Sequence, residues 1–204
     1  MAVFPNDPTA TIPDRIKGLI FDCDGTLVDS MRIHYSAWKE AMEAVNIEIS
    51  QKRFYSLAGV PTLTIVQTLA KEQNVTCDVQ AAAENKERLY LAKIESIEPI
   101  HRVVEIVRRE KGRRKLAVAS GGYRDVINKS LAAVGLQGMF EAIVGAGDVK
   151  HGKPAPDMFL KAAECLNLKP EECVVYEDSG LGIEAAIAAG MQAIDVRPWY
   201  AHRR

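Results

Sequence analysis

The sequence predicts an α/β protein, in which a doubly wound parallel sheet carries a small inserted helical domain. Two observations support this fold class. Short apolar runs alternate with segments of helical periodicity, and the runs lack the polar alternation of half-exposed strands. This alternation stops between about Met31 and Glu98, where only helical patterns occur, and it resumes at Pro99. A chain of 204 residues is long enough to bury such a core.

Five apolar runs are predicted strands, and four of the intervening segments are predicted helices. The strands are expected over Gly18–Cys23, Lys115–Ser120, Ala142–Gly145, Cys173–Glu177 and Gln192–Val196. The helices are expected over His101–Lys111, Arg124–Val134, Pro156–Leu166 and Gly180–Ala189. Pro156 suits a first helical turn, and Gly135 and Gly190 suit helix ends. This βαβ order predicts a Rossmann-like sheet of parallel strands.

The segment without strand–helix alternation, residues 31–98, is predicted to be a helical cap domain. Its helical patterns cover Met31–Val45, Thr62–Glu72 and Asp78–Ile94. Ligands of open parallel sheets bind beyond the carboxyl ends of the strands, so an insertion directly after the first strand would lie over the ligand as a lid. Residues 15–30 and 99–204 would form the core domain, and the proline-containing residues 1–14 a flexible lead-in.

Composition excludes several classes of function. A net charge of −1 gives no footprint for nucleic acid or for an acidic membrane surface. The local basic run over residues 102–115 carries apolar residues at helical spacing, which is typical of a solvated helix face. No signal peptide and no membrane span is indicated. The four cysteines form no CxxC pair, so neither a zinc site nor a disulfide framework is expected. We expect a cytoplasmic monomer that acts on a small molecule.

Polar residues gather where the predicted strands end. The first strand leads into Asp22 and Asp24, the second into Ser120 and Gly121, the third into a loop with Lys153, and the fourth into Glu177 and Asp178. Because the carboxyl ends of parallel strands meet at one edge of a sheet, we expect these side chains to share one pocket.

The chemistry of this pocket indicates phosphoryl transfer. A cluster of carboxylates is stable only with a cation or with shared protons, and oxygen ligands favour Mg²⁺. A substrate phosphate would be received by Ser120, by the amides near Gly121 and by Lys153. A metal-bound carboxylate can attack phosphorus to form an aspartyl phosphate, and a second carboxylate two residues on could transfer the proton.

Four motifs carry a resemblance to a known family. Asp22-x-Asp24-Gly-Thr, Ser120-Gly121, Lys153-Pro154 and Glu177-Asp178 resemble, in this order, the motifs of the haloacid dehalogenase superfamily. The resemblance covers nearly the whole chain after about Lys17 and is nearest to the β-phosphoglucomutase-like branch, which carries a helical cap at this insertion point. Within that branch the sequence is most similar to bacterial phosphatases that act on fructose 1-phosphate and 6-phosphogluconate.

The resemblance implies a role for each residue of the core site. Asp22 would be the nucleophile and Asp24 the general acid and base. Asp22, the backbone carbonyl of Asp24 and Asp178 would be Mg²⁺ ligands, and Glu177 would be a further ligand or a partner of the ligands. The serine and lysine of the second and third motifs would bind the phosphate that is transferred.

The resemblance also implies substrate contacts in the cap. His34 and Trp38 in "HYSAW" and Lys86 in "ENKERL" match cap positions of the branch, although ordinary helix packing or a solvated lysine would produce the same residues. Mutases of this branch carry an arginine just after a Gly-Val-Ser segment of the cap, where this sequence has Pro61 and Thr62 in "AGVPTLT". This departure favours a phosphatase of small sugar phosphates and leaves β-phosphoglucomutase as the alternative.

Two other classes of protein share part of this pattern. Receiver modules also group aspartates, a hydroxyl and a lysine around Mg²⁺, but they place adjacent acids after the first strand and have no helical insertion. A non-catalytic binder of phosphorylated ligands would leave the chemical groups unused. The segment "GLGIEA" from Gly180 matches a dinucleotide-binding fingerprint, but the acids at its mouth would repel a pyrophosphate, so we interpret these glycines as close helix packing.

Overall fold

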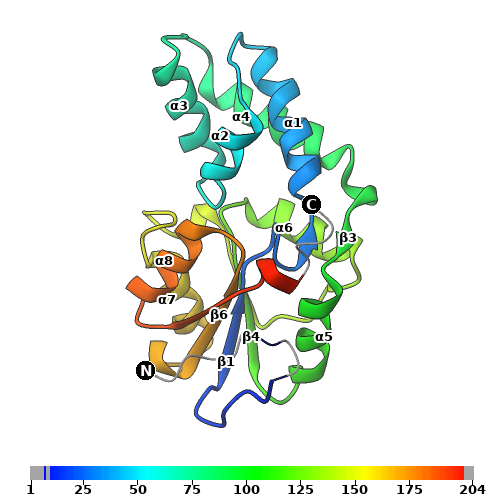
Figure 1. Cartoon of the computed structure of the whole chain (residues 1–204), viewed down its shortest axis with the longest axis vertical. Coiled ribbons are helices and arrows are strands. Elements are labelled where there is room, and N and C mark those ends of the chain that lie inside the picture. The colour runs from blue at the N-terminus through cyan, green and yellow to red at the C-terminus, as the bar shows by residue number, and fades with distance from the viewer. Residues whose placement is uncertain (1–6, 8–9, 200–204) are drawn as a thin grey trace.

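The computed structural model describes residue 7 and residues 10–199. Figure 1 shows an α/β unit with a helical unit standing over one end of its sheet. Most of the lead-in expected over residues 1–14 lies outside the described residues.

All five expected strands are confirmed, and they form one parallel sheet of order β5-β4-β1-β6-β7. Their bounds are β1 Gly18–Phe21, β4 Lys115–Ala119, β5 Ala142–Val144, β6 Cys173–Glu177 and β7 Gln192–Asp195. Four of them end one or two residues before the predicted ends, and after three of them the next residue, Asp22, Ser120 or Val196, still donates its backbone N–H to the neighbouring strand. The first strand, for example, ends at Phe21, and the chain bends at Cys23.

Helices cover both faces of the sheet, as the apolar runs predict. Their bounds are α5 His101–Glu110, α6 Arg124–Ala133, α7 Asp157–Cys165 and α8 Gly180–Ala188. Leu19 and Phe21 pack in a cluster with α5 and α6, whereas Ile20 packs with α7 and α8. Successive residues of a strand point to opposite faces, so β1 is buried on both. Gly135 and Gly190 follow α6 and α8 with φ of +70° and +75°, which confirms them as helix ends.

The helical unit contains one more helix than the sequence predicts. Its bounds are α1 Met31–Glu43, α2 Gln51–Ser56, α3 Thr62–Glu72 and α4 Val79–Leu91. The additional helix, α2, is too short to show a period, and only Ser50, whose hydroxyl caps it by accepting from the Arg53 amide at 3.2 Å, marks its start. Asp78 is the N-cap of α4 and not its first residue. The unit has an apolar core of its own, which includes Trp38 and Tyr90.

The two chain crossings between the units lie side by side. Strand β2 (Val28–Asp29) pairs antiparallel with β3 (Glu98–Pro99), with Val28 opposite Pro99. Two-residue strands leave no periodic signal, so the sequence does not predict this pair. Short 3₁₀ turns complete the structure at Ile94–Ser96, Ala146–Asp148, Pro170–Glu172 and Arg197–Trp199.

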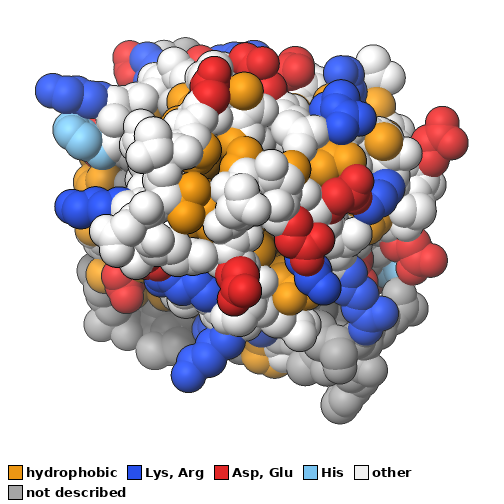
Figure 2. All heavy atoms as spheres, turned by 90° about the horizontal axis from the view of Figure 1, so that it is seen from above, with side chains coloured by type: hydrophobic (Ala, Val, Ile, Leu, Met, Phe, Trp, Pro, Cys, Tyr) orange, Lys and Arg blue, Asp and Glu red, His pale blue; other side chains and the backbone are white. Residues whose placement is uncertain are grey.

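The surface of the helical unit is mixed in charge. Figure 2, which views the molecule from that end, shows acidic and basic side chains interspersed with hydrophobic ones. In the part of the chain that the structure describes, no helix combines the length and apolar character needed to cross a membrane.

Candidate active site

Asp22 lies at the centre of a buried charged cluster just beyond β1. Its backbone N–H donates to the carbonyl of Tyr176 at 3.0 Å, which continues the pairing of β1 with β6 by one residue. Lys153 donates from Nζ to Asp22 Oδ1 at 2.6 Å and to Glu177 Oε2 at 2.6 Å. Burial lowers the pKa of Lys153, but the two carboxylates outweigh it and raise that pKa above its ordinary value. Lys153 is therefore a permanent cation that joins the ends of two strands.

One lysine does not balance the acids around it. Asp22, Glu177 and Asp178 are all buried, and one oxygen of each lies within 4.8 Å of the others. Burial and the charges of Glu177 and Asp178 raise the pKa of Asp22 well above its ordinary value, against the pull of Lys153. Such a cluster needs a further positive charge to stay ionised, and its donors are all oxygen. The residues therefore fit a hard divalent cation such as Mg²⁺.

Two glycines allow the backbone to come close to these carboxylates. Gly25 has φ of +86°, and a Cβ there would lie 2.3 Å from Asp178 Oδ2. A Cβ on Gly182 in α8 would lie 2.1 Å from the Glu177 carboxylate. The second of these contacts confirms close packing against an acid for Gly182, whereas a Cβ on Gly180, the other glycine of the "GLGIEA" segment, would meet nothing within 4 Å. The positions of Gly25 and Gly182 tolerate only glycine without movement of the acidic cluster.

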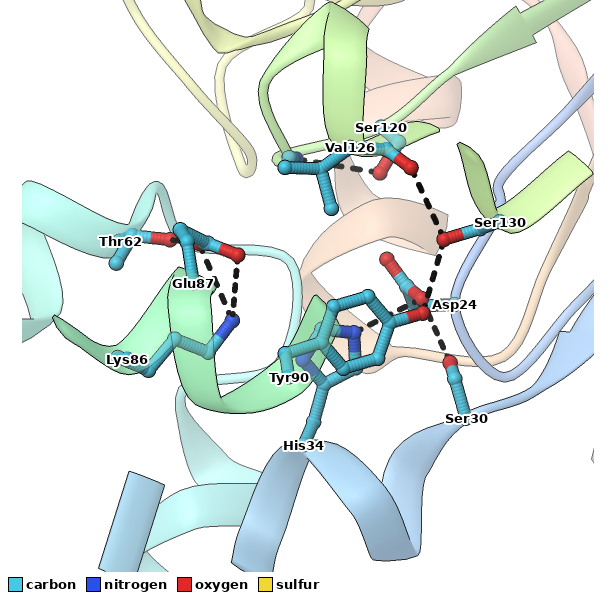
Figure 3. A network of polar contacts seen from close by, with 11 residues as sticks. Asp24, Ser30, His34, Thr62, Lys86, Glu87, Tyr90, Ser120, Val126 and Ser130 are labelled. Atoms are coloured by element: carbon cyan, nitrogen blue, oxygen red, sulfur yellow. Dashed lines mark hydrogen bonds and ion pairs between the residues drawn. The ribbon is translucent and has the colours of Figure 1, made fainter. Parts of the chain in front are cut away.

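Asp24 lies in a different electrostatic environment, although it is only two residues from Asp22. Its Oδ1 accepts from the Ser30 hydroxyl at 2.6 Å and lies 2.9 Å from His34 Nε2 (Figure 3). Burial raises the pKa of Asp24, but the His34 charge and the hydrogen bonds outweigh burial and lower that pKa to about 2. Asp24 is therefore held as a carboxylate by residues at the start of α1.

Ser120 and Gly121 follow β4 at the same edge of the sheet. The buried Ser120 hydroxyl accepts from the Gly122 amide at 3.3 Å. A Cβ on Gly121 would lie 2.8 Å from the carbonyl oxygen of Gly59, which precedes α3. The helical unit thus touches the sheet edge here.

Residues of α1 and α4 form the opposite side of the cavity. The His34 ring stacks on Tyr90 with a centroid distance of 3.9 Å, and Lys86 Nζ lies 5.3 Å from the Trp38 ring and 5.5 Å from the Tyr90 ring. The Tyr90 hydroxyl reaches the core unit, where it lies 2.9 Å from the Ser130 hydroxyl. Burial raises the pKa of Tyr90 far above its ordinary value. The aromatic rings and the lysine stem therefore pack against one another on this side of the cavity.

Glu87 is a charged residue of the cavity that the sequence does not single out. It lies within 3.2 Å (Oε1) and 3.3 Å (Oε2) of Lys86 Nζ, and its Oε1 also accepts from the Thr62 hydroxyl at 2.7 Å. Both partners had been noted separately, Lys86 as a substrate contact and Thr62 as a departure from the mutase pattern. Nothing in the sequence joins positions that are 25 residues apart. The available signal was that Glu87 directly follows Lys86, a residue that the resemblance places at a substrate contact.

The structure brings the predicted site residues to one cavity between the two units. Those that line it are Asp22, Asp24, His34, Trp38, Lys86, Ser120, Gly121, Glu177 and Asp178. The remaining one, Lys153, reaches the same cluster from behind through its two hydrogen bonds.

The sequence and the fold are both similar to those of known hydrolases and phosphate-metabolising enzymes. Residues 16–190 match the family model described as "Hydrolase: haloacid dehalogenase-like hydrolase". The chain is 40% identical over 185 residues to fructose-1-phosphate phosphatase YqaB of Escherichia coli, covering 90% of this chain and 98% of that protein. It is 28% identical to 6-phosphogluconate phosphatase of Escherichia coli, covering 87% and 81%. A crystal structure of β-phosphoglucomutase from Clostridium difficile superposes with a TM-score of 0.79 at 28% identity, covering 87% and 83%.

Proposed function

The chain belongs to the haloacid dehalogenase-like hydrolases, and on that premise we propose that it is a Mg²⁺-dependent phosphatase of small sugar phosphates. The first substrates to test are fructose 1-phosphate and 6-phosphogluconate, because two similar phosphatases are named after them. The observation that carries the proposal is the buried cluster of Asp22, Glu177, Asp178 and Lys153, which faces the same cavity as the Ser120 hydroxyl.

The proposed chemistry uses the two aspartates in turn. The Asp22 carboxylate attacks phosphorus, the bond from phosphorus to the sugar oxygen breaks, and an aspartyl phosphate forms. The leaving oxygen takes its proton from the Asp24–His34 pair, and Asp24 then removes a proton from the water that hydrolyses the intermediate. Ser120 and Lys153 hold the phosphate oxygens and stabilise their charge.

Asp22, Asp178 and the carbonyl of Asp24 are the proposed Mg²⁺ ligands. The bound ion would neutralise charge on the phosphate oxygens. Glu177 already accepts hydrogen bonds at both oxygens: Oε2 from Lys153, and Oε1 from the amides of Asp178 and Ser179 at 3.1 and 2.8 Å. We therefore assign Glu177 to the support of Lys153 and of the turn, and not to direct coordination.

Residues 31–98 are the proposed cap domain, and residues 15–30 and 99–204 the core domain. The adjacent crossings at Val28–Asp29 and Glu98–Pro99 would let the cap open and close on the core. His34, Trp38 and Lys86 line the cavity and would contact the sugar.

The test is a phosphate-release screen across sugar phosphates, with and without Mg²⁺. We expect release only with the metal and only with Asp22 intact, so Asp22→Asn is the matched inactive variant. The mutase alternative is examined with β-glucose 1-phosphate and a bisphosphate primer. Formation of glucose 6-phosphate without net phosphate release would overturn the phosphatase proposal.

A further inference from the structure

The side of the cavity that faces the phosphate site carries a carboxylate. Glu87 lies on α4, its side chain is 12% exposed, and it lines the same cavity as Asp22 and Ser120. Figure 3 shows Glu87 between Thr62 and Lys86, across the open centre of the view from Asp24. A substrate whose phosphate sits on the sheet edge would direct its other end toward this carboxylate.

The lysine on this side of the cavity is already paired. Among the described residues that line the cavity, Lys86 is the only lysine or arginine. Its Nζ lies 3.2 and 3.3 Å from the two oxygens of Glu87, so the pair is close to neutral. A second phosphate or a carboxylate on the substrate would meet the Glu87 charge and would have to compete with it for Lys86.

The Glu87 carboxylate is held in place but retains acceptor capacity. Thr62 on α3 and Lys86 on α4 fix it from two helices. A carboxylate can accept about four hydrogen bonds, and these partners use three of those positions. The remaining lone pair is available to a hydroxyl donor, because Glu87 opens into the cavity. Sugars and polyols supply such hydroxyls without adding charge.

From this geometry we infer that Glu87 determines substrate specificity: it accepts hydrogen bonds from the hydroxyls of an uncharged sugar and rejects a second anionic group at that end. The inference rests on the proposed function and narrows it. Monophosphates of neutral sugars, such as fructose 1-phosphate, are substrates. Aldonic acid phosphates such as 6-phosphogluconate and sugar bisphosphates are disfavoured.

The test compares kcat/KM for fructose 1-phosphate, 6-phosphogluconate and fructose 1,6-bisphosphate in the wild type, Glu87→Gln and Glu84→Gln. Glutamine keeps the shape and the Thr62 hydrogen bond but releases Lys86 as a free cation. We expect Glu87→Gln to raise kcat/KM for either substrate with a second anionic group, relative to fructose 1-phosphate, by about tenfold. Glu84 is exposed on the same helix and bonded only to Gln80 among the contacts described, so its variant controls for a lost charge outside the cavity.

Several outcomes would overturn the inference. One is that the wild type hydrolyses 6-phosphogluconate as efficiently as fructose 1-phosphate. Another is that the ratio of kcat/KM for the anionic substrates to kcat/KM for fructose 1-phosphate is the same in Glu87→Gln and in Glu84→Gln. If Glu87→Gln folds poorly, Thr62→Val loosens the same carboxylate and should shift the ratio in the same direction by a smaller factor; an unchanged ratio counts against the inference. Failure of the proposed function looks different, because the wild type would then release no phosphate from any of the three compounds.

Discussion

The two walls of the cavity handle charge in opposite ways. The strand-end wall, made of Asp22, Ser120, Glu177 and Asp178, has more buried carboxylates than Lys153 behind it can balance. The helical wall is made of His34, Trp38, Thr62, Lys86 and Glu87, and it pairs Lys86 with Glu87.

This contrast suggests a different role for each wall: reaction at the phosphate for the strand-end wall and substrate discrimination for the helical wall. A wall with excess buried negative charge favours the binding of a cation, because burial among acids disfavours the charged form of Asp22. A wall whose charges cancel has no drive to bind an ion and can instead distinguish neutral from anionic groups.

The largest effect should come from Asp22→Asn in the strand-end wall. We expect kcat for phosphate release to fall by about 10⁴-fold, because the amide cannot form the aspartyl phosphate. Loss of one acid from a crowded cluster should not lower thermal stability in EDTA, which unfolding curves can check. A variant that retains full activity would show that Asp22 is not the nucleophile.

Removal of the proposed Mg²⁺ should impair phosphate release, which depends on the strand-end wall, and should leave the helical wall unchanged. We expect EDTA to lower phosphate release by about 10³-fold and added Mg²⁺ to restore it. Saturating Mg²⁺ should also raise the melting temperature of the wild type, since a ligand at about 100 times its Kd stabilises by about 2.7 kcal/mol. Calorimetry with Asp178→Asn, which removes a proposed ligand, should show a smaller rise; an equal rise would place the ion elsewhere.

Lys153→Met should destabilise the fold itself. The change leaves Asp22 and Glu177 buried without their counter-ion, so we expect the free energy of unfolding in EDTA to fall by about 3 kcal/mol. Urea unfolding measures this, and Mg²⁺ should recover part of the loss. The neighbouring Lys150 is exposed, and Lys150→Met is the matched control. Equal stability of the two variants would argue against charge imbalance in this wall.

Tyr90→Phe tests the contact between the helical wall and the core. The variant loses the hydroxyl bonded to Ser130 but keeps the ring that stacks on His34. We expect a loss of about 1 kcal/mol in the free energy of unfolding, with KM and kcat changed less than threefold. A large loss of kcat would mean that the Tyr90 hydroxyl takes part in the reaction, which would contradict the separate roles of the two walls.

The smallest effect is expected outside the cavity, at the exposed ion pair of Arg53 and Glu72 in the helical unit. Glu72→Gln should lower the free energy of unfolding by no more than about 1 kcal/mol and leave specificity unchanged, because solvent screens the pair. Thermal unfolding and the three-substrate comparison used for Glu87 measure both. A specificity change here would mean that charge anywhere on the helical unit selects substrates.

The sequence by itself determined the order and type of the main elements and most of the strand-end wall. Burial on both faces of β1 shows in its unbroken apolar run, and Asp22 and Asp24 lie directly after it. Such features are local, because strand and helix periods and the residues at strand ends depend on near neighbours in the chain. The short elements α2, β2 and β3 contain too few residues to show a period, so the sequence does not predict them.

Only the tertiary structure decided how the charges are matched. Asp22 and Asp24 look alike in the sequence, yet burial among acids raises the pKa of one while His34 and Ser30 lower that of the other. The pairing of Thr62 with Glu87 depends on how α3 packs against α4. Charge energies depend on distances in space between groups that are remote in the chain, and periodicity carries no record of those distances.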